Sequence, residues 1–186
     1  MGTPTTRGPW ADGCDADCVR EWRELAAQRS SLGNAGRPQL LVAVGTTNWL
    51  DLVSNWVASV ESVGCTNYVL LGTDDVIVQS LRKVGLPMFR HALMPASTHV
   101  THLGVRFRAA LWMRRWQRIA QLVERGFDVL HSDLDAVMMI NPFTAQLAPE
   151  LERADVVASH GTSHEDWLVC MGWLWLRSTE VVRRQL

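Results

Sequence analysis

The sequence predicts an α/β protein in which helices flank a mostly parallel sheet. Short continuous apolar runs of strand length recur along the chain, and such runs are typical of strands buried on both faces. In the first half of the chain, these runs alternate with segments whose apolar residues recur at helical spacing. Because that order builds a parallel sheet through helical crossovers, we expect helices on the faces of the sheet.

Length and composition indicate one globular domain of moderate size. The chain has 186 residues, of which 47% are apolar and 20% charged, a balance typical of globular rather than disordered chains. Its net charge of -1 leaves no basic excess for phosphates, which argues against nucleic-acid binding. No apolar run reaches the roughly 18 residues of a transmembrane helix, and the N-terminus lacks the apolar core of a signal peptide.

Residues 1–37 are rich in Gly, Pro, Thr and Asp, and we expect a flexible N-terminal arm there. A short helical patch at 19–28 is the exception. The domain proper is expected over residues 38–186.

The four cysteines fall into two groups. Cys14 and Cys18 lie in the polar arm, where a disulfide between them is compatible with their spacing. Cys65 and Cys170 stand among apolar residues, so we expect both to be small core residues.

The first half of the chain predicts two strand–helix units. The apolar run at 39–45 has the character of a central parallel strand, and a turn at 46–48 follows it. Apolar residues then recur at helical spacing from Leu50 until Gly64, which is a good helix stop. The second unit consists of a strand at 68–71, an acidic turn at 72–75 and a helix that ends at Gly85 and Pro87.

The second half predicts one long helix and several shorter elements. The long helix spans 105–125 and carries an apolar stripe with two tryptophans, while arginines are distributed around it. The chain stops inside a helix that begins after Ser178, so we expect the fold to be incomplete at the C-terminus. The other expected elements are strands at 88–93, 127–130, 155–159 and 168–176 and a helical stretch at 144–153.

Asp133 and Asp135 follow the buried strand at 127–130 and are separated by Leu134. Side chains at i and i+2 of an extended segment project to the same side, so the two carboxylates can share one hard cation. Burying two unpaired carboxylates between apolar runs is costly, which also favours a counter-ion. The alternative is a solvated turn, where aspartate is common. The apolar flanks favour a site.

Two chemistries fit a strand followed by Asp-x-Asp. In the first, a divalent cation on the pair bridges the two phosphates of a nucleotide-sugar and neutralises the leaving nucleoside diphosphate. The base and ribose then bind at the carboxyl ends of the first parallel strands, close to Thr46, Thr47, Asn48 and the Thr73-Asp74-Asp75 turn.

In the second chemistry, the motif resembles the nucleophile motif of haloacid-dehalogenase-type phosphatases. Asp133 would then accept the phosphoryl group, and Asp135 would act as the general acid. That motif normally opens its domain and is followed by a lysine and an acidic pair. The residues after Asp135 contain neither a lysine nor an Asp-Asp pair, so position counts against the phosphatase.

Several segments together resemble the nucleotide-diphospho-sugar transferase family, which includes plant and algal cell-wall arabinosyl-, xylosyl- and galactosyltransferases. The segment GFDVLHSDLDAVMMINPF, with Asn-Pro after Asp-x-Asp, resembles the core of the family pattern closely. The likeness covers residues 40–179. Its other segments, in the order of the family, are VGTTNWLDLVSN at 44–55, YVLLGTDD at 68–75, VGLPMF at 84–89 and GWLWLRST at 172–179.

The resemblance implies a GT-A-type, Rossmann-like nucleotide-sugar fold with Mn²⁺ or Mg²⁺ on the Asp-x-Asp motif. By the same likeness, Asp135 ligates the metal directly, and Asp133 lies towards the ribose or a metal-bound water. The implied partners are a nucleotide-sugar donor, with UDP-sugar as the expectation, and a glycan or glycoprotein acceptor. The implied setting is the Golgi or secretory pathway.

The resemblance also assigns the nucleoside pocket. Thr46, Thr47 and Asn48 would line it, and Asp74 or Asp75 would help to orient the nucleoside. The alternative is a purely structural role, in which the two aspartates cap the N-terminus of the helix that begins there.

Two departures from the family pattern leave a third hypothesis open. Cys170-Met171 stands where the family usually has Asn-Thr before the glycine, so a polar contact to donor or acceptor would be lost. The expected C-terminal truncation would remove a further metal ligand and the acceptor site. A non-catalytic nucleotide-sugar-binding module would have both features.

Other residues have a structural interpretation beside a functional one. His131 is expected to be a packed or surface histidine, and Trp173 and Trp175 are expected to be core residues rather than a sugar platform. The weaker candidates for ligand contacts are His160 and His164 for a metal and Arg106 and Arg108 for phosphate.

Overall fold

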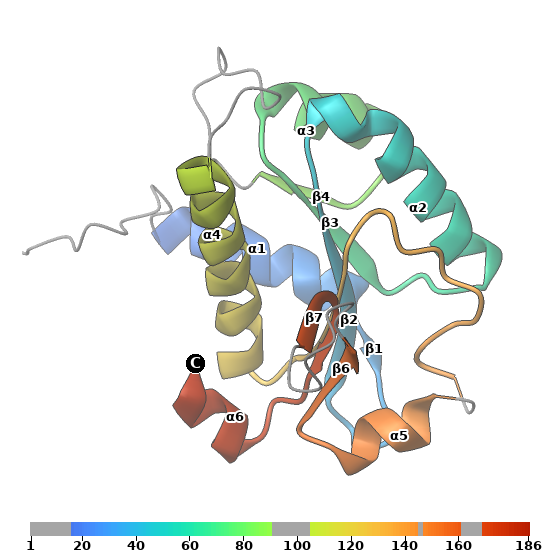
Figure 1. Ribbon diagram of the computed structural model, residues 1–186, viewed down its shortest axis with the longest axis vertical. Coiled ribbons are helices and arrows are strands. Elements are labelled where there is room, and N and C mark those ends of the chain that lie inside the picture. The colour runs from blue at the N-terminus through green and yellow to red at the C-terminus, as the bar shows by residue number, and fades with distance from the viewer. Residues whose placement is uncertain (1–15, 91–104, 145–146, 161–168) are drawn as a thin grey trace, which may run out of the picture.

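The computed structural model describes residues 16–90, 105–144, 147–160 and 169–186. Seven strands of this part form one sheet, whose order is β4-β3-β2-β5-β7-β6, with β1 beside β2. Figure 1 shows helices on both sides of the sheet. The predicted α/β class is confirmed, and the arrangement agrees with a GT-A-like fold.

The sheet is parallel through its centre and antiparallel at one side. Strands β2 (Pro38–Gly45), β3 (Tyr68–Gly72), β4 (Met88–Arg90) and β5 (Asp128–Ser132) run parallel to their neighbours. The antiparallel strands are β7 (Val169–Leu176) beside β5, β6 (Val156–His160) beside β7, and the short β1 (Ser31–Leu32) beside β2. The run at 39–45 is therefore a central strand, as the sequence predicts.

Helices cover the sheet in two layers. One face packs against α2 (Leu50–Ser62), α3 (Asp75–Lys83) and α5 (Ala148–Arg153), and a short 3-10 helix η1 (Thr47–Trp49) leads into α2. The other face packs against α1 (Ala16–Arg29), α4 (Val105–Glu124) and α6 (Glu180–Gln185). None of the helices in the described residues is long and apolar enough to cross a membrane.

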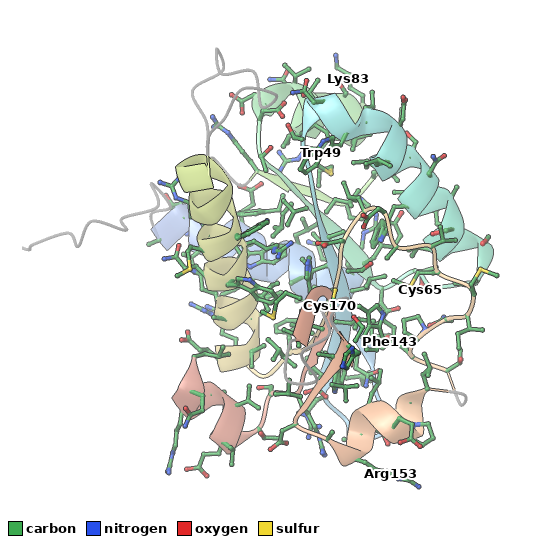
Figure 2. The ribbon with its side chains drawn as sticks, viewed as in Figure 1. Trp49, Cys65, Lys83, Phe143, Arg153 and Cys170 are labelled. Carbon is green, nitrogen blue, oxygen red and sulfur yellow. The ribbon has the colours of Figure 1, made fainter. Side chains whose placement is uncertain are left out.

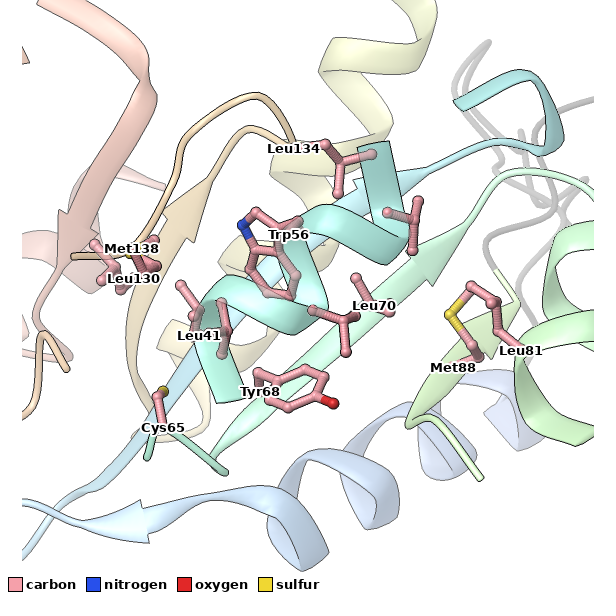
Figure 3. Close-up of a cluster of buried hydrophobic side chains, with 14 of the residues drawn as sticks. Leu41, Trp56, Cys65, Tyr68, Leu70, Leu81, Met88, Leu130, Leu134 and Met138 are labelled. Atoms are coloured by element: carbon pink, nitrogen blue, oxygen red, sulfur yellow. The ribbon is translucent and has the colours of Figure 1, made fainter. Parts of the chain in front are cut away.

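Side chains along β2 point alternately to the two faces of the sheet and therefore contribute to both hydrophobic cores. Leu41 and Ala43 pack in the cluster under α2 and α3, whereas Leu40, Val42 and Val44 pack in the cluster under α1 and α4. Figure 3 shows the first cluster, in which side chains from β2, β3, α2 and α3 meet. A strand with both faces covered needs apolar residues at every position, which explains the continuous run in the sequence.

The N-terminal segment corrects one expectation. Part of the expected flexible arm, residues 16–32, forms α1 and β1, which are built into the domain. Trp22 is fully buried, its ring centroid lies 4.9 Å from that of Phe89, and its Nε1 donates to the carbonyl oxygen of Arg118 at 3.2 Å. The sequence predicts the helical patch at 19–28, but it does not predict that the helix packs on the domain, because its partners are distant in sequence.

Other boundaries differ modestly. The helical stretch expected at 144–153 begins only at Ala148, because Thr144 belongs to a turn. The last three residues of the strand expected at 88–93 lie outside the described residues.

The cysteines are only partly as expected. Cys65 is a buried free thiol, and burial raises its pKa to about 11. Cys170 is also a free thiol, but it is only half-buried, so it is not the core residue that its apolar neighbours suggest. Cys18 is disulfide-bonded, and Cys14 lies outside the described residues.

Candidate functional site

The candidate site lies where the order of the strands reverses. From β2 the chain proceeds outward through β3 and β4, and it then returns through α4 to β5 on the other side of β2. In open α/β sheets, the crevice outside the carboxyl ends of two such strands is the usual place for a ligand. A pocket of about 200 Å³ lies there, and its lining comes from β2, η1, α2, α4 and the segment after β5: Val44, Trp49, Leu52, Trp112, Arg115, Asp133, Leu134 and Asp135.

The Asp-x-Asp segment is fixed by hydrogen bonds at its start. The backbone N–H of Asp133 donates to the carbonyl oxygen of Gly172 on β7 at 2.7 Å. The hydroxyl of the fully buried Ser132 donates to the carbonyl oxygen of Asp133 at 2.9 Å and accepts from Trp56 Nε1 at 3.2 Å. Helix α2 and strand β7 therefore both hold the turn in place.

The end of the same segment is anchored by the Asn-Pro motif. The side-chain amide of Asn141 donates to the carbonyl oxygen of Gly64 at 3.2 Å, and its oxygen accepts from the N–H of Phe143 at 3.0 Å. Met138 is buried in the core under α2. These contacts give the Asn-Pro part of the motif a structural role, because they tie the segment to the end of α2.

Asp133 is held by two basic groups. Nη1 of Arg115 lies 2.9 Å from Oδ1 of Asp133, and Nε2 of His131 lies 3.3 Å from the same oxygen. The contact with His131 and the charge of Arg115 lower the pKa of Asp133, against the effect of its partial burial. Asp133 is therefore a carboxylate whose charge is already partly balanced within the protein.

His131 is almost fully buried, which confirms the interpretation as a packed histidine. Burial lowers its pKa, and the neighbouring charge of Arg115 acts in the same direction. Its Nδ1 lies 3.0 Å from the carbonyl oxygen of Val42, so its two ring nitrogens face two acceptors. A neutral imidazole carries one hydrogen and donates to only one of them.

Besides Val44 and Leu134, which flank predicted site residues, four residues of the pocket were not predicted from the sequence. Arg115 and Trp112 are three residues apart on α4 and therefore share one face of the helix. Trp49 ends η1, and Leu52 lies in the first turn of α2; Figure 2 labels Trp49 near the start of that helix. The sequence distributes arginines around α4 without distinguishing them, and in the structure Arg115 is buried. In the sequence, Arg115 stands next to the apolar stripe of this helix, and that position could have predicted its burial. The side chains of Arg106 and Arg108 lie outside the described part of α4.

The predicted nucleoside residues form a second cluster beside the pocket. Asp74 caps α3 by accepting from the N–H of Ile77 at 3.0 Å. It also accepts from the hydroxyl of Thr46 at 3.1 Å, from the N–H of Thr47 at 2.9 Å and from the Thr47 hydroxyl. Partial burial opposes ionisation, but these donors together lower the pKa of Asp74. The structure thus joins the ends of β2 and β3.

The other two predicted nucleoside residues are arranged differently. Asn48 lies exposed in η1, next to the pocket residue Trp49. Asp75, at the start of α3, accepts from Nη2 of Arg90 at 3.0 Å, so its charge is paired at the far side of β3. Neither residue lines the described pocket.

Gly172 explains how closely β7 approaches the acidic turn. A Cβ atom at this position would lie 2.7 Å from Oδ2 of Asp133 and 3.4 Å from Sγ of Cys170. A side chain at Gly172 would therefore displace the carboxylate. The departure at Cys170-Met171 lies on the strand beside Asp133.

The two carboxylates could supply some, but not all, of the ligands of a hard cation. Asp133 and Asp135 line one pocket, Asp135 is exposed, and carboxylate oxygens are the ligands that Mg²⁺ and Mn²⁺ accept. Within the described ranges, no three His, Cys, Asp or Glu side chains are close enough to hold a metal. Remaining ligands would come from phosphate and water, which is usual for Mg²⁺ in nucleotide sites.

The other candidates in the described residues do not line the pocket. Trp175 is fully buried, and its Nε1 donates to the carbonyl oxygen of Leu151 at 2.9 Å, which confirms it as a core residue. Trp173 packs against the same core. His160 is exposed at the end of β6, and His164 lies outside the described residues.

Comparison with known proteins gives a consistent result. Residues 63–183 match the family model described as nucleotide-diphospho-sugar transferase. The chain is 28% identical over 127 residues to a UDP-D-xylose:L-fucose alpha-1,3-D-xylosyltransferase of Arabidopsis thaliana, covering 66% of this chain and 34% of that protein. A second protein of that plant, named UDP-D-xylose:L-fucose alpha-1,3-D-xylosyltransferase 1, is 27% identical with coverages of 66% and 35%. The match thus spans about a third of the length of these relatives.

Proposed function

Since the chain belongs to the nucleotide-diphospho-sugar transferase family, we propose that it is the donor-binding part of a metal-dependent glycosyltransferase. The observation that carries the proposal is the pocket at the switch point, which both carboxylates of the Asp-x-Asp motif line. The reaction would transfer a sugar from a nucleotide-diphosphate-sugar to a glycan or glycoprotein. The family match also favours this reaction over the phosphatase chemistry that the same motif permits.

We assign separate roles to the two aspartates. Asp135 is exposed in the pocket and is the direct metal ligand in this proposal. Asp133 is already paired with Arg115, so it contributes a second oxygen to the metal or orients the ribose or a metal-bound water. A divalent cation bound there would neutralise the charge that develops on the leaving nucleoside diphosphate. The backbone contacts of Asp133 keep its carboxylate in place for this role.

The donor proposed for this site is a UDP-sugar, and the two named relatives act on UDP-D-xylose by their names. The walls of the pocket support a nucleotide ligand, because Trp49 and Trp112 present partly exposed aromatic surface next to the charged floor. The cluster of Thr46, Thr47 and Asp74 lies at the neighbouring strand ends, where the nucleoside would bind.

A Golgi or secretory setting is part of the proposal, and the disulfide at Cys18 agrees with an oxidising compartment.

The test is a calorimetric titration of the purified chain with UDP, with and without Mn²⁺. We expect binding that depends on Mn²⁺ and that weakens by at least about tenfold in Asp135→Asn, because the variant loses a charged metal ligand. Asp17→Asn is the matched control, since Asp17 is exposed on α1 and is not part of the pocket lining. It should bind UDP like the unmodified chain.

Two results would contradict the proposal. If the unmodified chain is folded by circular dichroism but does not bind UDP with or without Mn²⁺, the pocket is not a donor site. If UDP binds equally well in Asp135→Asn, the site exists but the assignment of the metal to Asp135 is wrong.

A further inference from the structure

Arg115 is a buried cation in the wall of the pocket. Its side chain is only 9% exposed, and its Nη1 contacts Asp133 at 2.9 Å. Within the described residues, no hydrogen-bond acceptor reaches its buried Nε. A guanidinium has five N–H donors, and the contact with Asp133 uses one of them. An unsatisfied buried donor is costly, and an acceptor supplied by a ligand would reduce that cost.

The charges around the pocket indicate what kind of ligand Arg115 suits. Of the described residues that line the pocket, Arg115 is the base and Asp133 and Asp135 are the acids. The lining therefore carries one more negative than positive charge, and a divalent cation on the aspartates would reverse that sign. A positively charged pocket with a planar guanidinium suits the oxygens of a diphosphate, which arginine binds through two parallel hydrogen bonds.

We propose that Arg115 is a donor-binding residue that contacts the diphosphate directly, in addition to pairing with Asp133. This inference rests on the proposed function, because it assumes that the pocket takes a nucleoside diphosphate. Nothing else in the described lining supplies a protein cation to that ligand. Trp112, one helical turn earlier on α4, lies on the same face of the helix and would border the same ligand.

The inference predicts that the affinities for Mn²⁺ and for UDP respond differently when Arg115 is removed. Arg115 sits 2.9 Å from a carboxylate that would help to hold the metal, so its positive charge opposes the cation there. Removing it should leave the affinity for Mn²⁺ alone unchanged or raise it. The affinity for UDP should fall, because the diphosphate loses charge-assisted hydrogen bonds. A residue that only oriented Asp133 would weaken both.

The experiment compares Arg115→Gln, Arg115→Lys and the control Arg125→Gln, all checked for folding by circular dichroism. Arg125 follows the same helix and is exposed, with a hydrogen bond to the carbonyl oxygen of Gln121. Binding of Mn²⁺ alone is followed by electron paramagnetic resonance, and binding of UDP at saturating Mn²⁺ by calorimetry. We expect Arg115→Gln to weaken UDP by at least about tenfold, Arg115→Lys by a smaller factor, and Arg125→Gln by less than about twofold.

The possible results separate the two proposals. UDP affinity within about twofold in Arg115→Gln would overturn the inference while leaving the donor site intact. A parallel loss of Mn²⁺ and UDP binding would also overturn it, because Arg115 would then act only by orienting Asp133. If the folded, unmodified chain does not bind UDP, the proposed function itself fails. If Arg115→Gln does not fold, Arg115→Lys provides the test. Lysine keeps the positive charge but lacks the planar guanidinium that forms two parallel hydrogen bonds, so unchanged UDP affinity in this variant would overturn the inference.

Discussion

An Asp–Arg pair lies at the start of strand β5 and another directly after its end, and the two pairs differ in what surrounds them. At the start of the strand, Asp128 accepts from Nε of Arg37 at 2.9 Å and 3.0 Å and from the N–H of Ser178 at 2.7 Å. At the end, Asp133 accepts from Arg115 at the same 2.9 Å. The side chain of Asp128 is 2% exposed, whereas that of Asp133 is 46% exposed and lines the pocket.

The comparison shows that a salt bridge does not by itself mark a functional site. The oxygens of Asp128 are all directed at protein donors, so the pair holds the segment before β2 and the segment after β7 against β5. Asp133 keeps an oxygen face towards the pocket, where a ligand can add to the protein contacts or replace them. Exposure and remaining coordination capacity therefore distinguish the two ends of the strand.

The largest effect that tests this contrast is on stability. We expect Asp128→Ala to lower the free energy of unfolding by about 3 kcal/mol, because it leaves Arg37 partly buried without its partner. Asp133→Ala should lower it by less, about 2 kcal/mol, because Arg115 also loses its partner but the space of the half-exposed carboxylate opens to the pocket, where water can replace it. Urea denaturation followed by circular dichroism measures both. Equal losses in the two variants would show that burial does not separate the pairs.

The next effect concerns the geometry of Asp133. Gly172→Ala places a Cβ only 2.7 Å from Oδ2 of Asp133, which is closer than a side-chain contact allows, so the carboxylate must move. We expect UDP to bind about tenfold more weakly in the presence of Mn²⁺, which corresponds to about 1.4 kcal/mol. Cys170→Ala is the control, because it removes atoms beside Asp133 instead of adding them. Unchanged UDP affinity in Gly172→Ala would mean that the position of Asp133 does not matter for the donor.

The smallest effect comes from Asp74, an aspartate at the neighbouring strand end that has uncharged partners. Its pKa is lowered in the folded state, so its ionised form stabilises the protein above the ordinary pKa of 3.8, and this contribution is lost as the pH falls through the folded pKa. We expect Asp74→Asn to be less stable than the unmodified chain at pH 6, by about 1 kcal/mol for a lost cap. The difference should shrink below about pH 4. A constant difference between pH 6 and pH 3 would contradict the role of its charge.

Local patterns in the sequence were sufficient for the elements that carry local signals. The continuous apolar run of β2, the helical spacing in α2 and α3 and the end of β5 at Asp-x-Asp each depend on residues that are neighbours in the chain. The position of Asp133 and Asp135 at a strand end follows from the same kind of pattern, and so does the strand-end cluster of Thr46, Thr47 and Asp74.

Contacts between distant residues were decided only by the tertiary structure. Arg115 pairs with Asp133, Trp22 donates to Arg118 across 96 residues of sequence, and Gly172 lies against Asp133. Each of these residues has an ordinary local context: an arginine on a charged helix, a tryptophan in a polar arm and a glycine within a predicted strand. Periodicity shows which side of a helix or strand is apolar. Which residue of another element contacts that side depends on how the layers pack. The sequence alone therefore determined the sheet and its acidic turn, whereas packing decided which cation faces that turn and that α1 belongs to the domain.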